Sequence, residues 1–315
     1  MSSINTNVSA MVAMQSLNRT NAALETAQKR IATGFRVNSA EDNAAYWSIA
    51  TTMRSDNSAL STVKDALGLG AATIDVAYTA INSAIDVTKE IKNKLVAARQ
   101  PGVDRGKVQS EITALQDQLQ SIGDSAVFSG QNWLSTDSSA AGYNASKSIV
   151  ASFSRSAGGA ISIGTISVDT SGMTLYDSGA AATEAGIVDG LRDATGAIDN
   201  AAGTFSIATM DISALTDSAG DLTILESYIA GADSGVSEMT DSATTLGATK
   251  QRVNLQKNFV SALMDAVDRG IGTLVDADMT EESTRLQALQ VQQQLGIQSL
   301  SIANQQGQSI LSLFQ

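Results

Sequence analysis

The sequence predicts a mainly α fold, in which long antiparallel coiled-coil helices from both chain ends enclose a small β-containing outer insertion. Apolar residues recur every seven positions in both halves of the chain, which is typical of helices that pack along a seam. The middle of the chain is instead rich in Gly, Ser, Ala and Asp. The chain has one proline among 315 residues, against a usual level of about 5%. Aromatic residues are 4% of the total, which favours helices packed at small residues over a ligand pocket.

The amino-terminal half contains three stretches with helical spacing. Gly34 interrupts the first stretch, and Gln100-Pro101-Gly102 forms a turn between the second and the third. We therefore predict a first helix near the amino end and then two antiparallel helices joined by a short turn. The apolar positions are Ala10, Met14, Leu17, Leu24 and Ile31 in the first stretch, Leu60, Leu67, Ile74, Ile81 and Leu95 in the second, and Val108, Ile112, Leu115, Leu119 and Ile122 in the third.

The carboxyl-terminal half carries the longest repeat, which runs from Leu225 to Leu274 in steps of seven residues. A helix over this span is about 75 Å long at 1.5 Å per residue. Lys250 and Lys257 interrupt its apolar face. Asp278-Met279-Thr280-Glu281 then has the pattern of a capping box, which predicts the start of a last helix.

The middle of the chain changes from helical spacing towards alternation. Segments 148–153, 161–168 and 205–212 are predicted as short strands separated by Gly and Ser-Gly turns. The resulting division has five parts. They are a first end helix (1–40), the amino-terminal part of a helical rod domain (41–134), an outer insertion (135–220), the carboxyl-terminal part of the rod domain (221–275) and a second end helix (276–315).

Both ends of the chain lack charged side chains, in residues 1–18 and again in residues 286–315. The last 30 residues contain ten glutamines, which can form hydrogen bonds without the cost of burying ions. Ends of this kind are expected to pack against other protein, so we predict that they find their partners by assembly. The predicted assembly core comprises Met14, Leu17, Leu24, Ile31, Leu289, Leu300, Ala303, Ile310 and Phe314.

Composition and motifs argue against several other classes of function. The net charge of −12 and the pI of about 4.4 disfavour nucleic acid and anionic membranes as partners. The chain has no Cys and no His, and no catalytic constellation or cofactor is predicted. Gly68-Leu69-Gly70 lacks the third glycine of a dinucleotide fingerprint, and close helix packing explains it better. Asp276, Asp278, Glu281 and Glu282 could hold calcium, although a helix cap explains them more simply.

No targeting or membrane segment is predicted. The first basic residue is Arg19, and the apolar runs are far shorter than a secretory signal or a membrane span requires. If the protein leaves the cell, another route must carry it.

Motifs at both ends resemble the bacterial flagellin family. The amino-terminal motifs are Ser3-Ile4-Asn5-Thr6-Asn7 and Arg30-Ile31-Ala32-Thr33-Gly34-Phe35-Arg36-Val37-Asn38-Ser39-Ala40-Glu41-Asp42-Asn43-Ala44-Ala45. The carboxyl-terminal motifs are Ala303-Asn304-Gln305 and Ile310-Leu311-Ser312-Leu313. The resemblance covers roughly residues 1–134 and 222–315, and Tyr46-Trp47-Ser48-Ile49-Ala50 is similar to alphaproteobacterial flagellins.

This resemblance implies a secreted, extracellular subunit that polymerises with itself into the flagellar filament used for swimming. The end helices would line the filament lumen, the rod helices would form a second layer, and the insertion would face outward. The implied partners are the flagellar export apparatus and its chaperone, the junction and cap proteins, and other flagellin isoforms. A hook–filament junction protein and, more remotely, a secreted enzyme with a catalytic insertion are the alternatives.

One departure from the family concerns the stretch that an animal innate immune receptor detects in some flagellins. The matching positions here are residues 88–96. Glu90 stands where Arg is expected, Asn93 where Glu is expected and Lys94 where Leu is expected. Reversing one charge and losing an apolar contact is expected to weaken a site that relies on Arg anchors.

Overall fold

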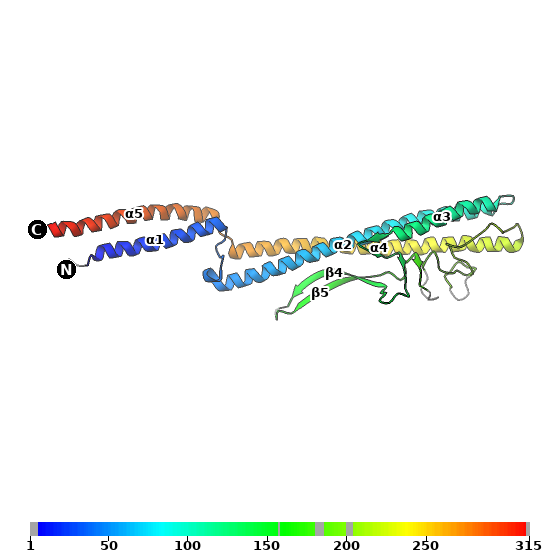
Figure 1. Cartoon of the computed structure of the whole chain (residues 1–315), viewed down its shortest axis with the longest axis horizontal. Coiled ribbons are helices and arrows are strands. Elements are labelled where there is room, and N and C mark those ends of the chain that lie inside the picture. The colour runs from blue at the N-terminus through cyan, green and yellow to red at the C-terminus, as the bar shows by residue number, and fades with distance from the viewer. Residues whose placement is uncertain (1–5, 157, 180–185, 200–203, 313–315) are drawn as a thin grey trace. The chain divides into compact units, whose positions relative to one another are not determined.

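The computed structural model describes residues 6–156, 158–179, 186–199 and 204–312, and these residues fold into two compact units. Unit 1 is formed by both ends of the chain (Met1–Ser58 and Leu263–Gln315), and unit 2 by Ala59–Ala262. The helices are α1 (Val8–Thr33), α2 (Ala40–Ala98), α3 (Arg105–Ser125), α4 (Ala219–Val275) and α5 (Met279–Ser312) (Figure 1). The strands are β1 (Val127–Phe128), β2 (Gln131–Asn132), β3 (Ser135–Thr136), β4 (Ser146–Arg155), β5 (Ile161–Asp169) and β6 (Tyr176–Asp177). The predicted mainly α fold with a small β-containing middle is confirmed, whereas the five-part division stays a prediction.

Helix α1 begins and ends at residues with clear capping roles. The Asn7 side chain accepts a hydrogen bond from the Ala10 amide, and Gly34 adopts a left-handed φ of 75° while its amide donates to the Arg30 carbonyl at 2.8 Å. A glycine pays no steric penalty in this conformation, so Gly34 is suited to end the helix. The predicted break at Gly34 is confirmed.

A small apolar core in unit 1 joins the segment after α1 to the end of α4. Val37, Ala50, Ile271 and Val275 are buried there, with Phe35, Met53, Val267 and Leu274 packed against them. The backbone supports the same contact, because the amides of Arg36 and Val37 donate to the Val275 carbonyl and the Ala277 amide donates to the Gly34 carbonyl. These bonds bring the end of α1 beside the start of α5.

The seven-residue repeats form the core of unit 2. Leu60, Leu67, Ile74, Ile81 and Leu95 on α2 are buried, as are Leu225, Ala232, Met239, Leu246, Val253 and Val260 on α4. Thr88 occupies the gap in the α2 repeat. Its buried hydroxyl is paired, because it donates to the Ala84 carbonyl at 2.8 Å. Lys250 pairs with Asp75 at 2.6 Å, which accommodates the first interruption of the α4 repeat.

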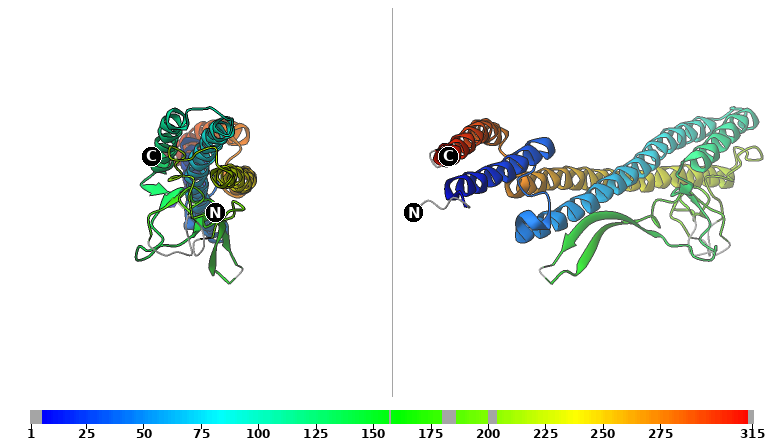
Figure 2. Two further views of the ribbon diagram at one scale, coloured as in Figure 1. Left: turned by 90° about the vertical axis from the view of Figure 1, so that its right-hand side faces the viewer. Right: turned by 60° about the vertical axis from the view of Figure 1, so that its left-hand side comes forward.

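Helix α3 packs back against the α2 helix, as predicted. Gly102, in the turn between them, has a φ of 84°. Ile112 and Leu119 are fully buried, and Lys94 near the end of α2 pairs with Glu111 near the start of α3 at 2.6 Å. This arrangement is the expected antiparallel pair (Figures 1 and 2).

Strands β4 and β5 form an antiparallel hairpin that lies against the helices of unit 2. Their register runs from Ser146↔Asp169 to Arg155↔Ile161, with an irregularity between Val150 and Ser152. At that irregularity the Ala151 carbonyl accepts a hydrogen bond from Gln256 of α4 at 2.9 Å. On α2, a Cβ at Gly70 would lie 2.5 Å from Ile149 Cγ2. Close packing against strand β4, and not the predicted packing against a helix, therefore accounts for Gly70, whereas a Cβ at Gly68 would meet open space.

The prediction of a third strand at 205–212 is wrong. Phe205 forms an isolated bridge with Arg192, and residues 207–209 form a turn. Glutamines of α3 satisfy the backbone that a partner strand would otherwise pair. Gln116 donates to the carbonyls of Ile207 and Met210, and the Ile212 amide donates to Gln109. The apolar side chains of this segment point into the core of unit 2 without forming a sheet.

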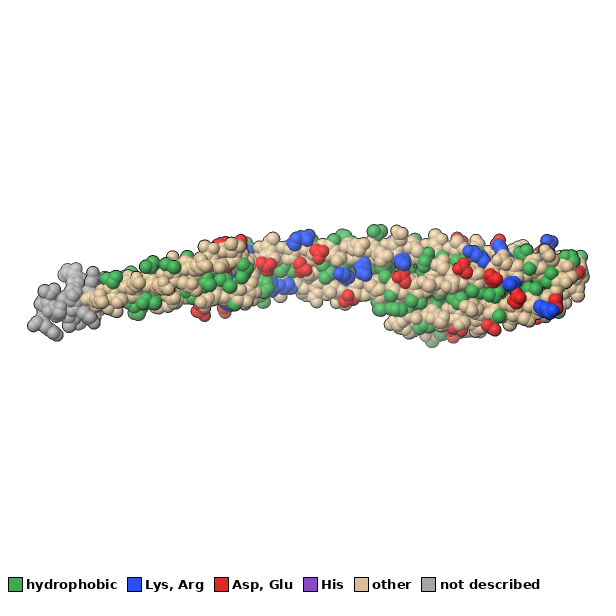
Figure 3. Space-filling model, turned by 90° about the horizontal axis from the view of Figure 1, so that it is seen from above, with side chains coloured by type: hydrophobic (Ala, Val, Ile, Leu, Met, Phe, Trp, Pro, Cys, Tyr) green, Lys and Arg blue, Asp and Glu red, His purple; other side chains and the backbone are tan. Residues whose placement is uncertain are grey.

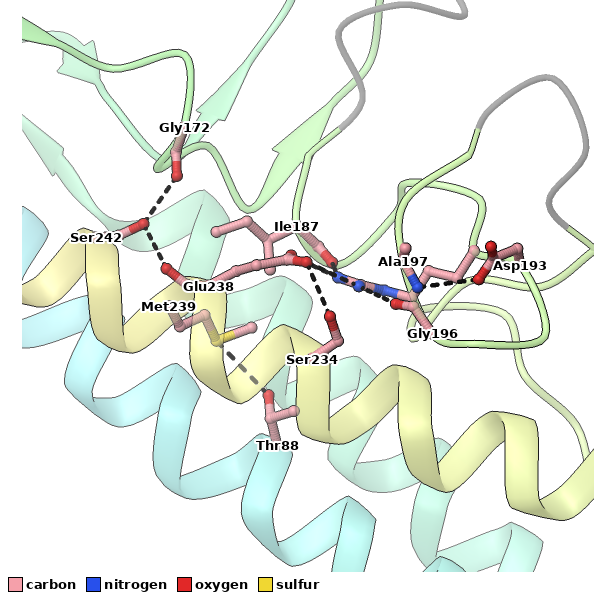
Figure 4. Close-up of polar contacts among 11 residues, drawn as sticks. Thr88, Gly172, Ile187, Asp193, Gly196, Ala197, Ser234, Glu238, Met239 and Ser242 are labelled. Atoms are coloured by element: carbon pink, nitrogen blue, oxygen red, sulfur yellow. Dashed lines mark hydrogen bonds and ion pairs between the residues drawn. The ribbon is translucent and has the colours of Figure 1, made fainter.

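A buried arginine fastens the insertion to α4. The Arg192 side chain is fully buried, and its guanidinium donates to both Glu238 oxygens at 3.1 and 2.8 Å. It also donates to the carbonyls of Gly196 at 2.8 Å and Ile187 at 2.7 Å. Figure 4 shows Ile187 and Gly196 around this contact, with Ser234 and Glu238 on the helix below.

Two glycines on α4 make this close approach possible. A Cβ at Gly231 would lie 2.6 Å from the Phe205 ring, and a Cβ at Gly235 would lie 2.5 Å from Ile207 Cδ1. Since Gly231 and Gly235 are four residues apart, they lie on one face of the helix. The part of the insertion around Arg192, Phe205 and Ile207 is therefore packed in the core of unit 2.

Candidate functional site: the paired end helices

The two charge-poor ends of the chain meet as the antiparallel pair α1 and α5 (Figures 1 and 2). Asn7 donates to the Ala303 carbonyl at 2.9 Å, and Gln293 donates to Asn21 at 2.8 Å. Arg30 pairs with Glu282 at 2.9 Å. The start of α1 thus contacts the end of α5, as in an antiparallel pair. Two of these three polar contacts are made by side-chain amides, and one is an ion pair.

The seam between α1 and α5 is thin. Among the described residues, its buried apolar side chains are the small Ala27 and Ala303. Close approach is possible at Gly296, where a Cβ would lie 3.1 Å from Leu17 Cδ1. Leu17, Leu24, Ile31, Leu289 and Leu300 are half-buried along the same seam. Because helix pairs gain most of their stability from buried apolar area, this pair gains little by itself.

The outer faces of the two helices are apolar and exposed. At about 100° per residue, these side chains lie opposite the seam on each helix. Their exposed fractions run from 55% to 66%. They are Val8, Met11 and Val12 on α1, and Val291, Leu295 and Ile302 on α5.

The surface around these side chains carries little charge, because residues 1–18 and 286–315 contain no charged side chain and Arg19 lies at the edge of the hollow that Val8, Met11 and Val12 line. In Figure 3, the surface next to the grey atoms is green and tan, with no blue or red nearby. Contiguous exposed apolar side chains of this kind commonly mark an interaction site, and they can be covered by another apolar surface.

The predicted assembly residues fall into three groups. The leucines and isoleucines at 17, 24, 31, 289 and 300, together with Ala303, lie in the seam within one chain. Met14 is instead 52% exposed, at the margin of the outer face of α1. The Ile310 side chain and Phe314 lie outside the described residues.

Sequence reasoning did not single out the outer-face residues. A signal for them exists in the spacing of Val291 and Ile302, which are eleven residues apart. Eleven residues are close to three helical turns, so the two side chains share a face that the seven-residue lines do not mark.

Acidic side chains at the start of α5 serve the helix terminus. Asp278 accepts hydrogen bonds from the Thr280 amide at 2.8 Å and the Glu281 amide at 3.2 Å, which hold the pKa of its carboxyl below the ordinary value. The bond from the Glu281 amide is the capping-box contact made by the Asp278 side chain, whereas the Glu281 carboxylate pairs with Arg285 at 2.9 Å. The cap explains Asp278, and the pairs with Arg30 and Arg285 explain Glu282 and Glu281.

The three positions that depart from the immune-receptor stretch lie on α2 in unit 2. Glu90 and Asn93 are exposed, and Lys94 is half-buried. The hydrogen bond and charge of Glu111 raise the pKa of the Lys94 ammonium above its ordinary value. This lysine is therefore held against α3, whereas Glu90 and Asn93 present a carboxylate and an amide to solvent.

None of the described helices is both long enough and apolar enough to cross a lipid bilayer.

Family models match the two end regions of the chain, and related proteins match its full length. Residues 4–139 match a family model described as the bacterial flagellin N-terminal helical region, and residues 229–314 match one described as the bacterial flagellin C-terminal helical region. "Flagellin C" of Rhizobium meliloti (strain 1021) is 52% identical, and "Flagellin A" of the same strain is 42% identical. A "Flagellin" of Brucella melitensis biotype 1 is 43% identical. Each alignment covers 100% of this chain and 100% of the relative.

Proposed function

The chain belongs to the bacterial flagellin family, and on this premise we propose that α1 and α5 form the innermost layer of the filament that it builds. The protein is a structural subunit of the flagellar filament, the extracellular propeller of swimming bacteria. In this proposal the outer faces of α1 and α5 are covered by other copies of the chain. Residues 1–40 and 276–315 are then the layer around the filament lumen.

One observation carries this proposal: six apolar side chains stay exposed on the outer faces of α1 and α5, within segments 1–18 and 286–315 that contain no charged side chain. The thin seam supports it, because a pair that gains little from its own contacts must gain stability elsewhere. Polymerisation supplies that stability by removing the outer apolar surface from water.

Cysteine labelling tests the proposal directly, because the natural chain has no cysteine. In an Ile302→Cys variant, the thiol is expected to react with a maleimide in the monomer and to become protected in the filament. Ile302 is 59% exposed in the single chain, so burial by neighbouring copies is what would protect the thiol. The measurement is the labelling rate in each state, followed by mass spectrometry.

A Ser178→Cys variant is the matched control, since Ser178 is exposed and lies in the insertion. Its thiol is expected to react in both states. Equal labelling rates for position 302 in monomer and filament would contradict the proposed layer.

Further partners are proposed from the same family membership. We propose that the chain leaves the cell unfolded through the flagellar export apparatus after release from a chaperone, and that it meets junction and cap proteins and other flagellin isoforms in the filament. The chain has no disulfide-forming residue to hold it folded during passage. The insertion (135–220) and the rod segments 41–134 and 221–275 would form the layers outside the lumen helices.

We also propose that this chain is a poor ligand for the animal innate immune receptor that detects other flagellins. The triple variant Glu90→Arg, Asn93→Glu, Lys94→Leu restores the expected side chains on α2 and should increase receptor activation. A reporter-cell assay with purified monomers measures the effect. Activation no greater than that of the natural chain would show that other positions decide recognition.

A further inference from the structure

The methionines differ widely in exposure, with three buried, three exposed, and Met53 and Met264 half-buried among the described residues. The chain has nine methionines and no cysteine, so thioethers are its oxidisable sulfur groups. Met173, Met210 and Met239 are at most 2% exposed, and all three lie in unit 2. Met11, Met14 and Met279 are 60%, 52% and 46% exposed, and all three lie in unit 1 on the paired end helices.

Exposure determines which of these thioethers a peroxide reaches first. In the reaction, the methionine sulfur takes one oxygen atom from hydrogen peroxide and water leaves. The sulfur is oxidised and the peroxide is reduced. The product is a sulfoxide, which replaces a flexible apolar group by a polar one.

We propose that Met11 and Met14 are a modification site for peroxide, and that their oxidation prevents a monomer from joining the filament. This inference rests on the proposed role of α1 in the filament interior. Both side chains border an open hollow along α1 whose lining also includes Val8 and Val12. Gln15, Asn18 and Arg19 line the polar end of the same hollow, whereas Val8 and Val12 form its apolar part beside Met11.

The monomer tolerates the change because both thioethers are already in water. A sulfoxide on an exposed helix face disturbs no core contact, so the helix content should be unchanged. In the polymer the same oxygen would be taken out of water against an apolar neighbour, which is unfavourable without a hydrogen-bond donor. Oxidation therefore acts before assembly, and assembly in turn protects the two sulfurs.

The experiment treats full-length monomer with hydrogen peroxide and then seeds polymerisation. Peptide mass spectrometry is expected to find oxygen added at Met11, Met14 and Met279 before Met173, Met210 and Met239. The critical concentration should rise by about tenfold or more. Sulfoxide at positions 11 and 14 should be enriched in the unpolymerised fraction, and treatment with methionine sulfoxide reductases should restore growth.

Two variants separate the site from general damage. A Met11→Leu, Met14→Leu double variant should have the same critical concentration before and after peroxide treatment, whereas the critical concentration of Met279→Leu should still rise on oxidation. Oxidised natural chain that polymerises at the untreated critical concentration would overturn the inference, as would a double variant that stays sensitive. These outcomes are distinct from a failure of the proposed lumen layer, which the labelling of position 302 decides without peroxide.

Discussion

An Ile302→Asp variant is expected to abolish filament growth while its monomer keeps the helix content of the natural chain. Ile302 is 59% exposed on the outer face of α5, so aspartate at this position is hydrated in the monomer. In the proposed filament, each subunit would bury an unpaired carboxylate, which costs several kcal/mol unless the group protonates. Light scattering measures the critical concentration, and circular dichroism checks the monomer.

Two controls isolate the effect of charge. An Ile302→Leu variant keeps the apolar surface and should polymerise normally. Ser178→Asp places the same charge on an exposed position of the insertion and should change stability by less than about 0.5 kcal/mol. Equal critical concentrations for Ile302→Asp and Ser178→Asp would mean that the outer face of α5 is not buried in the filament.

Position 302 tests assembly more cleanly than its neighbour. Ala303 is 8% exposed in the seam, and its carbonyl accepts a hydrogen bond from Asn7. An Ala303→Asp variant should therefore also abolish filament growth, but it would disturb the α1–α5 pair within the monomer. Because Ile302 is exposed in the monomer, a substitution there affects assembly without disturbing the fold of the single chain.

A Glu238→Ala variant is expected to destabilise unit 2 by about 3–5 kcal/mol, because it leaves a buried guanidinium without its carboxylate. Arg192 is fully buried and would keep two backbone carbonyls as acceptors. The loss should loosen the insertion from the Gly231 and Gly235 face of α4. Urea unfolding, followed by circular dichroism, measures the free energy of unfolding.

Glu226 on the same helix is the matched control. It pairs with Arg99, but both side chains of that pair are more than half exposed. A Glu226→Ala variant should cost less than about 1 kcal/mol, as exposed ion pairs usually do. An Arg192→Met, Glu238→Leu double variant should recover part of the stability, since it removes both charges. If Glu238→Ala proved as mild as Glu226→Ala, Arg192 would not be holding the insertion in place.

The sequence predicted the helices well because each long helix repeats its own signal. The seven-residue spacing identifies the buried line of α2 from Leu60 to Leu95 and that of α4 from Leu225 to Val260. Gly34 and Asp278 add stop and start signals whose physical basis is local. Local signals of this kind can be read without knowing the rest of the fold.

Contacts between distant segments were not predictable in the same way. The pair Arg192 and Glu238 joins residues 46 positions apart, and no periodicity connects them. The same limit explains the wrong strand at 205–212, where glutamines of α3 take the hydrogen bonds that a strand partner would provide. A short alternating segment does not reveal whether its backbone pairs with a strand or with side chains.

The sequence prediction placed the assembly residues on α1 and α5, but it marked their seam and not their exposed outer faces. The seven-residue lines through Leu17, Leu24, Leu289 and Leu300 mark the seam within one chain. The outer residues Val291, Leu295 and Ile302 follow a different spacing. A helix that packs on two sides needs two apolar faces, and a single repeat identifies one of them.

The thin seam between α1 and α5 has a consequence for the kinetics of growth. Two monomers that meet in solution would cover only part of their outer faces. The seam within each monomer adds little stability, because its buried apolar side chains are the small Ala27 and Ala303. In the proposed filament, a monomer that reaches an existing end is contacted by several neighbours, which cover both helices at once. The first oligomers are then much less stable than an extended end, which creates a nucleation barrier. Growth should consequently favour the tip of an existing filament over spontaneous initiation in the cell.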